Sequence, residues 1–211
     1  MLIMEKIEDL NLHDSITCGQ IFRFKVEEDN SYTVILKDRV VNIKQEQDKL
    51  MVKSNNYDNL EKVITKYLDL ETDYDSINKI LINQDKSIED AVINSRGLKM
   101  IRQDPFETVM EYIISANNRV PSIANSMNLI ANRHGEKIEF EGKEYYLFPS
   151  CETLKDLSVE DFRNAKVGFR DKYLFNIVQE INNKNLIVED VDNLETRRST
   201  KTFNKLFRNR A

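Results

Sequence analysis

The hydrophobic pattern of this chain changes its period once, near Tyr57, and that change constrains the fold more than any other feature. The first fifty residues or so alternate between apolar and polar side chains, most clearly over 20–54, in short runs separated by turns rich in Asp, Asn and Ser. Such runs are typical of short antiparallel strands. After Tyr57, apolar residues recur three and four positions apart, which indicates amphipathic helices. We therefore expect an α+β fold, strand-rich first and helical afterwards.

The helical part contains recognisable start and stop signals. The segment 104–118 opens with Asp104 at the N-cap and Pro105 at the first helical position, which is a favourable capping arrangement. A second helix is expected from Pro121 to Gly135. The remaining segments with helical spacing are 59–70, 74–84, 86–97 with Gly97 as a C-cap, 158–168 and 170–183.

Composition limits the class of protein. A chain of 211 residues, 40% of them hydrophobic, can bury enough surface to fold without disulfides. Cys18 and Cys151 are far apart and form no CxxC spacing, so we expect a reducing compartment. His13 and His134 stand alone, and we expect neither a metal site nor a cofactor. No apolar run reaches the roughly 18 residues that a membrane helix needs, so the expectation is a cytoplasmic monomer without a membrane partner.

Charge separates the end of the chain from the rest. Residues 197–211 hold six Lys or Arg and no acidic residue, whereas residues 1–196 hold 25 basic and 36 acidic side chains. Together with the change of period, this separates a strand-rich start, a helical body and a basic tail over 196–211. The net charge of −5 says little about DNA binding, which depends on a local basic face.

Four short stretches carry residue types that local structure does not demand. In "TCGQIFRF", Gly19 lets a ligand approach the backbone closely, or is an ordinary turn glycine. In "ISANN", Asn117 and Asn118 suit base edges and phosphates, but equally a helix end. "YYLFPS" is typical of a core. In "KVGFRDKYL", Phe169 and Arg170 could face DNA as an apolar wedge and a cation, or form a helix cap. Taken singly, each stretch favours the structural interpretation.

Taken together and in order, the motifs "CGQIFRF", "GLKMIRQDPFETVMEYIISANN", "YLFPS" and "VGFRDKY" resemble the 8-oxoguanine DNA glycosylase family over nearly all of residues 8–195. The resemblance implies an antiparallel β domain over 1–100, similar to half of a TATA-binding protein. This domain would pack on a partial α-helical domain of the helix-hairpin-helix glycosylase superfamily over 101–195, followed by an aberrant basic tail over 196–211. It implies base excision repair of double-stranded DNA containing oxidised guanine, by N-glycosylase action with an associated AP lyase activity.

The resemblance also implies roles for single residues. The Gly19 carbonyl would accept a hydrogen bond from the N7 proton that distinguishes 8-oxoguanine from guanine. Asn117, with Asn118 beside it, would enter the space that the extruded base leaves. Phe169 would be the wedge, and Arg170 would contact the estranged base. Ser122 departs from the family, which often has an Arg there for recognising cytosine opposite the lesion, so a strict cytosine preference is not expected.

The largest departure concerns catalysis. The family's chemistry needs a nucleophilic Lys and a supporting Asp, both beyond a glycine-rich hairpin. After "DNLE" this chain continues as "TRRSTKTFNKLFRNRA", with no Gly after Gly168, and nothing in the sequence positions Lys201 or Lys205. We therefore expect no catalytic residue in this chain. The tail is interpreted as a frame-shifted remnant, because a one-base shift of a plausible coding sequence gives a hairpin-like "LGIGP", or else as a basic DNA-binding arm.

Three functions stay open on the sequence alone. The first is a repair glycosylase. The second is a non-catalytic DNA-binding module that keeps Asn117, Phe169 and Arg170. The third is an α+β interaction protein or inactive remnant without affinity for DNA, which the acidic body of the chain favours.

Overall fold

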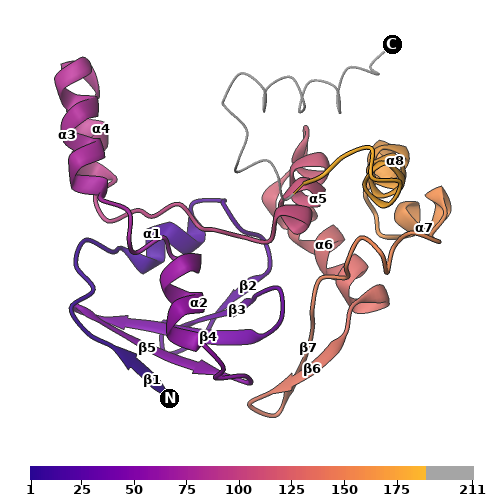
Figure 1. The fold of residues 1–211 in the computed structure, drawn as a ribbon, viewed down its shortest axis with the longest axis horizontal. Helices are drawn as coiled ribbons and strands as arrows, with labels where there is room; N and C mark the ends of the chain where they lie inside the picture. The colour runs from indigo at the N-terminus through magenta and orange to yellow at the C-terminus, as the bar shows by residue number, and fades with distance from the viewer. Residues whose placement is uncertain (189–211) are drawn as a thin grey trace. The chain divides into compact units, whose positions relative to one another are not determined.

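A five-stranded antiparallel sheet occupies the first part of the chain (Figure 1) in the computed structural model, which describes residues 1–188. The strands follow the spatial order β1-β5-β4-β3-β2. Along β4, Val41 and Ile43 are fully buried, whereas Asn42 and Lys44, which follow them in turn, are half-buried, so the predicted alternation is confirmed. The strand bounds are Leu2–Met4 for β1, Phe24–Val26 for β2, Tyr32–Ile35 for β3, Val40–Glu46 for β4 and Lys49–Ser54 for β5.

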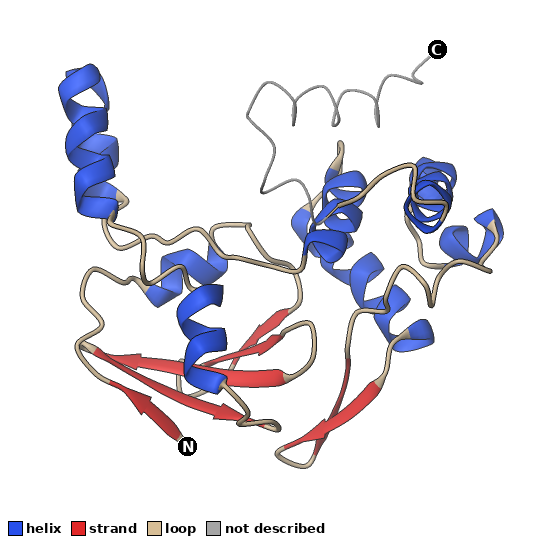
Figure 2. Cartoon of the chain, in the orientation of Figure 1, coloured by secondary structure: helices blue, strands red, loops and turns tan. Residues whose placement is uncertain are grey.

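Two helices, α1 (Leu12–Thr17) and α2 (Leu60–Tyr67), pack on this sheet and complete its hydrophobic core (Figure 2). Leu12, Ile16 and Ile64 are at most 1% exposed and join the apolar side chains of the strands in one cluster. The expectation that the first fifty residues are strand-like is wrong at α1. A helix of six residues is too short to show a helical period, and it is started by the Asn11 side chain, which accepts a hydrogen bond from the Asp14 amide.

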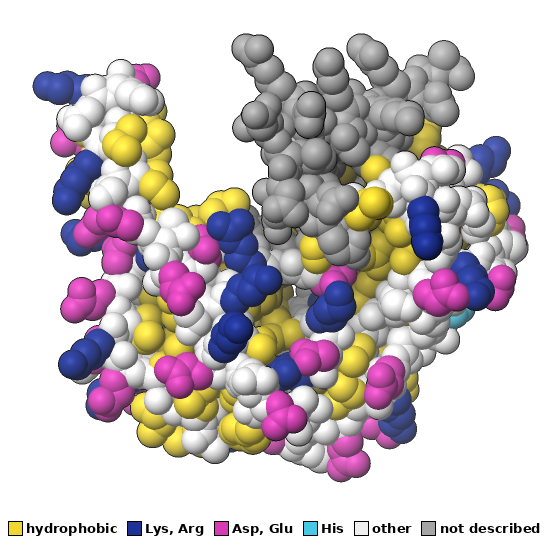
Figure 3. Space-filling model, in the orientation of Figure 1, with side chains coloured by type: hydrophobic (Ala, Val, Ile, Leu, Met, Phe, Trp, Pro, Cys, Tyr) yellow, Lys and Arg dark blue, Asp and Glu magenta, His cyan; other side chains and the backbone are white. Residues whose placement is uncertain are grey.

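A helical arm follows α2 and projects from the sheet (Figure 1). It consists of α3 (Tyr74–Gln84), a 3₁₀ turn η1 (Lys86–Ile88) and α4 (Glu89–Asn94), and none of these elements contains a buried residue. Yellow side chains on the arm in Figure 3 show apolar surface in the open, and its exposed aliphatic residues are Ile77, Ile80, Leu81 and Ile93. The predicted C-cap at Gly97 is wrong by two residues, because α4 is capped at Ser95.

The same compact unit includes a hairpin from much later in the chain. Strands β6 (Lys137–Phe140) and β7 (Lys143–Tyr146) pair antiparallel. An ion pair of 2.7 Å joins Glu141 in the hairpin turn to Lys53 of β5. The two turn residues, Glu141 and Gly142, both have positive φ (50° and 73°), as a type I′ turn requires. This hairpin was not predicted, because Glu-Gly is a weaker turn signal than Asn-Gly.

The second compact unit is helical and comprises, among the described residues, 104–136 and 148–188. The predicted cap of α5 is confirmed, since the Asp104 carboxylate accepts hydrogen bonds from the amides of Phe106 and Glu107. A buried apolar core runs through all four helices, and Met110, Met127 and Phe162 are at most 1% exposed. The element bounds are Pro105–Ser115 for α5, Val120–His134 for α6, Val159–Asn164 for α7, Gly168–Arg170 for the 3₁₀ turn η2 and Asp171–Asn182 for α8.

The first unit comprises 1–103 with 137–147. The domains predicted over 1–100 and 101–195 stay predictions, and the units differ from them chiefly in the hairpin. The predicted tail over 196–211 lies outside the described residues, as do residues 189–195. Among the described helices, none has the length and apolar character needed to cross a membrane.

Candidate nucleic-acid interface

Arg170 joins two turns of the helical unit. Its Nε lies 3.0 Å from the carbonyl oxygen of Ala116, and its Nη2 donates to the carbonyls of both Ala116 and Asn117, the latter at 3.0 Å. Its Nη1 donates to the carbonyl of Val167 at 3.0 Å. The turn after α5 and the turn before α8 are therefore held by one side chain that uses all three of its nitrogens.

The environment of Arg170 explains why it can serve as a clamp. The residue is 6% exposed, and burial lowers the pKa of its guanidinium, which nevertheless stays charged as arginines do in proteins. The hydrogen bonds described for it go to carbonyl oxygens, whose dipoles stabilise the charge. The neighbouring carboxylate of Asp171 is instead bound by Nε of Arg163 at 2.8 Å. The position of Arg170 is thus fixed by backbone groups of both turns.

Two side chains stand out from the clamped turns. Phe169 is 63% exposed, and the guanidinium carbon of Arg170 lies 4.4 Å from the centroid of its ring. Asn117 is exposed and takes a left-handed backbone conformation with φ of 52°, which Asn tolerates better than most residues. Since Arg170 contacts both, the structure brings an exposed aromatic ring and an exposed amide together, as a wedge and a gap-filling residue would require.

The structure gives Asn118 a different part from its neighbour. Its Nδ2 donates to the carbonyl of Ile114 at 3.1 Å, and its Oδ1 accepts from the amide of Arg119 at 2.9 Å. These bonds cap the end of α5 and shape the turn. The contact of Asn118 with DNA stays a prediction, whereas its hydrogen bonds stabilise the turn.

The surroundings of the turns are basic although the chain is acidic. Residues 115–123 and 165–173 contain four basic side chains and one acidic one, Asp171, which is buried. Sequence reasoning missed Arg119, Lys166 and Lys172, which are exposed around the clamp. A local charge count would have found them, whereas the net charge over the whole chain hides them.

Gly19 belongs to the other compact unit. It directly follows Cys18, the C-cap of α1, and its φ is 94°, so the left-handed end of a helix already explains a glycine here. Gly19 is exposed, and a Cβ built on it would meet nothing within 4 Å. No hydrogen bond from the described residues reaches its carbonyl oxygen. A free, exposed carbonyl is available there for a donor on a ligand.

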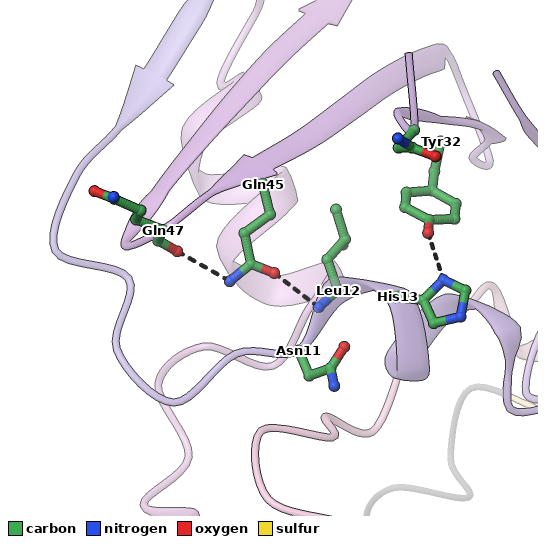
Figure 4. Close-up of a pocket in the computed structure, with 7 residues that line it drawn as sticks. Asn11, Leu12, His13, Tyr32, Gln45 and Gln47 are labelled. Atoms are coloured by element: carbon green, nitrogen blue, oxygen red, sulfur yellow. Dashed lines mark hydrogen bonds between the residues drawn. The ribbon is translucent and has the colours of Figure 1, made fainter. Parts of the chain in front are cut away.

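A shallow depression beside α1, about 500 Å³ in volume, was not foreseen (Figure 4). His13 Nδ1 and Tyr32 Oη lie 2.6 Å apart in it, and the Gln45 amide is bonded to the backbone of Leu12. These bonds occupy His13, Tyr32 and Gln45, and the depression holds none of the predicted site residues. Residues 1–188 also contain no group of three or more His, Cys, Asp or Glu side chains placed to hold a metal ion.

Comparison with known proteins gives matches along most of the chain. The family model for the N-terminal domain of 8-oxoguanine DNA glycosylase matches residues 2–109. The N-glycosylase/DNA lyase OGG1 of Arabidopsis thaliana is 24% identical over 181 residues, which are 83% of this chain and 50% of that protein. The chain therefore spans about half the length of this relative.

Solved structures agree with these matches. The 8-oxoguanine glycosylase/lyase of Clostridium acetobutylicum in its apo form is 33% identical, with a TM-score of 0.91 over 97% of this chain and 71% of that one. The same enzyme in complex with double-stranded DNA containing cytosine opposite 8-oxoguanine gives a TM-score of 0.88 over 98% of this chain and 73% of that one. The predicted α+β architecture is confirmed by these likenesses.

Proposed function

The chain belongs to the 8-oxoguanine DNA glycosylase family, and from this premise we propose that it recognises oxidised guanine in double-stranded DNA for base excision repair. The observation that carries the proposal is the pair of exposed side chains, Asn117 and Phe169, on turns that Arg170 holds together. Such a pair suits a protein that takes a base out of the stack, because the vacated space must be filled and the neighbouring bases kept apart.

Each predicted residue has a part in this proposal. Phe169 wedges between base pairs, and Asn117 fills the gap beside it. The exposed lysines and Arg119 supply phosphate contacts that carry no sequence information. The contact with the estranged base predicted for Arg170 would use the remaining N–H of Nη1, or would replace one carbonyl bond by a bond to the base. Exposed Ser122 offers no guanidinium to an opposite cytosine, so we propose a relaxed opposite-base preference.

In the same proposal, Gly19 discriminates the lesion. 8-Oxoguanine carries a proton on N7, whereas guanine presents a lone pair there. A carbonyl oxygen accepts a hydrogen bond from the first and faces an unfavourable lone pair on the second. The free carbonyl of Gly19 fits this task, and a left-handed glycine keeps side chains out of the way of the base.

Base removal is a separate part of the proposal. The relatives are N-glycosylases and DNA lyases, and we propose that the whole protein excises 8-oxoguanine and cleaves the resulting abasic site in the cytoplasm, at the nucleoid. The Lys and Asp that the resemblance requires have no counterpart in the motifs of this chain. A non-catalytic DNA-binding module is the second candidate, favoured by the predicted DNA-binding residues that lie within residues 1–188.

Two measurements on the 211-residue chain test these proposals. Fluorescence anisotropy should show tighter binding to a duplex with one 8-oxoguanine opposite cytosine than to the matching undamaged duplex. Equal affinities, or no binding at low salt, would contradict lesion recognition. Borohydride trapping on the damaged duplex tests catalysis, since an enzyme amine that forms a Schiff base becomes covalently attached. An adduct would support the glycosylase/lyase, and binding without an adduct would support the module.

A further inference from the structure

Gly19 is followed by a residue whose side chain is unusually well fixed. The amide of Gln20 bonds an extended backbone segment at two points: Nε2 donates to the carbonyl of Lys99 at 2.8 Å, and Oε1 accepts from the amide of Ile101 at 3.0 Å. In a strand ladder, a neighbouring peptide group would make the same two bonds. The Gln20 side chain therefore substitutes for a strand that is absent beside 99–101.

A second glutamine fixes the backbone of the same residue. Nε2 of Gln103 donates to the carbonyl of Gln20 at 2.7 Å. The backbone is therefore held on both sides of Gly19. On the helix side, the amide of Cys18 donates to the carbonyl of Asp14 at the C-cap of α1. On the other side, Gln103 donates to the carbonyl of Gln20. The carbonyl of Gly19 itself is left free, as described above. A free acceptor between two fixed points is a preorganised acceptor.

We infer that Gln20 and Gln103 are positioning residues that set the direction of the Gly19 carbonyl and so the discrimination between 8-oxoguanine and guanine. The inference rests on the proposed function. Neither glutamine needs to touch the damaged base. Both act through the peptide group that does, because a hydrogen bond to N7 depends steeply on the angle at which the carbonyl meets the donor.

The variant that tests this directly is Gln103→Met, which keeps the length of the side chain and removes its donor. We expect the ratio of affinities for 8-oxoguanine and guanine duplexes to fall about fivefold, which corresponds to one net hydrogen bond. Affinity for undamaged duplex should be unchanged, because it comes from phosphate contacts elsewhere. Gln20→Glu should have the same effect, since a carboxylate cannot donate to the Lys99 carbonyl.

The chain offers a matched control in Gln45. Its amide also bonds an i, i+2 pair, accepting from the Leu12 amide at 2.9 Å and donating to the Leu10 carbonyl at 2.6 Å (Figure 4 shows the first). Gln45→Glu removes an equivalent bond at the start of α1 rather than at its Gly19 end. It should lower thermal stability about as much as Gln20→Glu and leave the affinity ratio unchanged.

The outcomes separate the inference from the proposed function. If the wild-type chain prefers the lesion and Gln103→Met keeps that preference while remaining folded by circular dichroism, the inference is overturned and the function stands. If Gln45→Glu lowers the ratio as much as the Gln103 and Gln20 variants, the effect is one of stability, and the inference is again overturned. If the wild-type chain shows no preference, the proposed function and the inference both fail.

Discussion

Nη2 of Arg170 lies 3.0 Å from the carbonyl oxygen of Asn117, a residue 53 positions earlier in the chain. This bond links the backbone of Asn117 to the exposed ring of Phe169, since the same guanidinium stacks on that ring. The two residues proposed to enter DNA are therefore presented by a rigid support. Rigid support matters because a wedge that is ordered before binding does not lose conformational entropy on binding.

Arg170→Lys should damage this support although it keeps the charge. A single ammonium cannot reach the carbonyls of Ala116, Asn117 and Val167 together, so at least one of these acceptors loses its partner. We expect the free energy of unfolding to fall by about 1–3 kcal/mol and DNA affinity to fall with it. Urea denaturation and anisotropy check this. Arg96→Lys is the control, because its side chain is 69% exposed and each of its ion pairs, with Asp9 and Asp75, should contribute less than about 1 kcal/mol. Equal losses in both variants would contradict the clamp.

Phe169→Ala should separate binding from stability. The side chain is 63% exposed, so its loss should change the free energy of unfolding by no more than about 0.5 kcal/mol. Stacking on bases contributes about 1–3 kcal/mol per base, so affinity for duplex should fall roughly 5- to 150-fold. Thermal denaturation and anisotropy on one preparation measure both. Tyr57→Ala, at an aromatic residue that is 49% exposed in the other unit, should leave affinity unchanged, and a similar loss there would refute a specific wedge.

The sequence predicted what depends on neighbours in the chain. The Asp104 cap lies within three residues of its partners, and the register of alternation in β4 needs only the order of its side chains. The burial of Arg170 could not be predicted, because its partners at Ala116 and Asn117 come from a turn more than fifty residues away. A motif therefore identified the residue, while only the structure shows that its nitrogens are occupied.

Glycine positions show the same limit. Gly97 has the positive φ typical of a chain reversal, but the position requires glycine because a distant segment of the chain passes close to it. A Cβ there would lie 2.8 Å from the backbone nitrogen of Asn11, and the Asn11 amide donates to the Gly97 carbonyl at 2.7 Å. A helix stop signal was readable in the sequence, whereas the close approach of two backbones was not.

Gly97→Ala should consequently be far more damaging than Gly142→Ala. Both glycines have positive φ, 84° and 73°, which costs an alanine about 1–2 kcal/mol. A Cβ at Gly142 meets nothing within 4 Å, whereas the one at Gly97 must displace backbone. We expect a further loss of about 2 kcal/mol or more at Gly97, within the range for strained or overpacked sites. Chemical denaturation of the two variants side by side measures the difference. Equal losses would show that the backbone at Asn11 moves aside at little cost in free energy.

Asp69 should make the stability of the β-rich unit depend on pH. Burial alone would raise the pKa of this carboxyl, but hydrogen bonds from Tyr74 at 2.5 Å, Arg102 at 3.2 Å and Thr72 at 3.0 Å bring the pKa below its ordinary value. A lowered pKa in the folded state means that folding favours the carboxylate. The stabilisation is fully present above the unfolded pKa, near 4, and is lost as pH falls through the folded value.

Asp69→Asn isolates this effect, because Asn tolerates the left-handed φ of 50° at this position and removes only the charge and acceptor capacity. At pH 7 the variant should be less stable than wild type by about 1–3 kcal/mol. The difference should shrink as pH falls below about 4, since the wild-type carboxyl then takes up a proton that the folded state disfavours. Urea denaturation at pH 7, 5, 4 and 3 gives the curve, with Asp48→Asn on the exposed turn after β4 as the control. A difference that stays constant from pH 7 to pH 3 would mean that Asp69 acts through shape and not through charge.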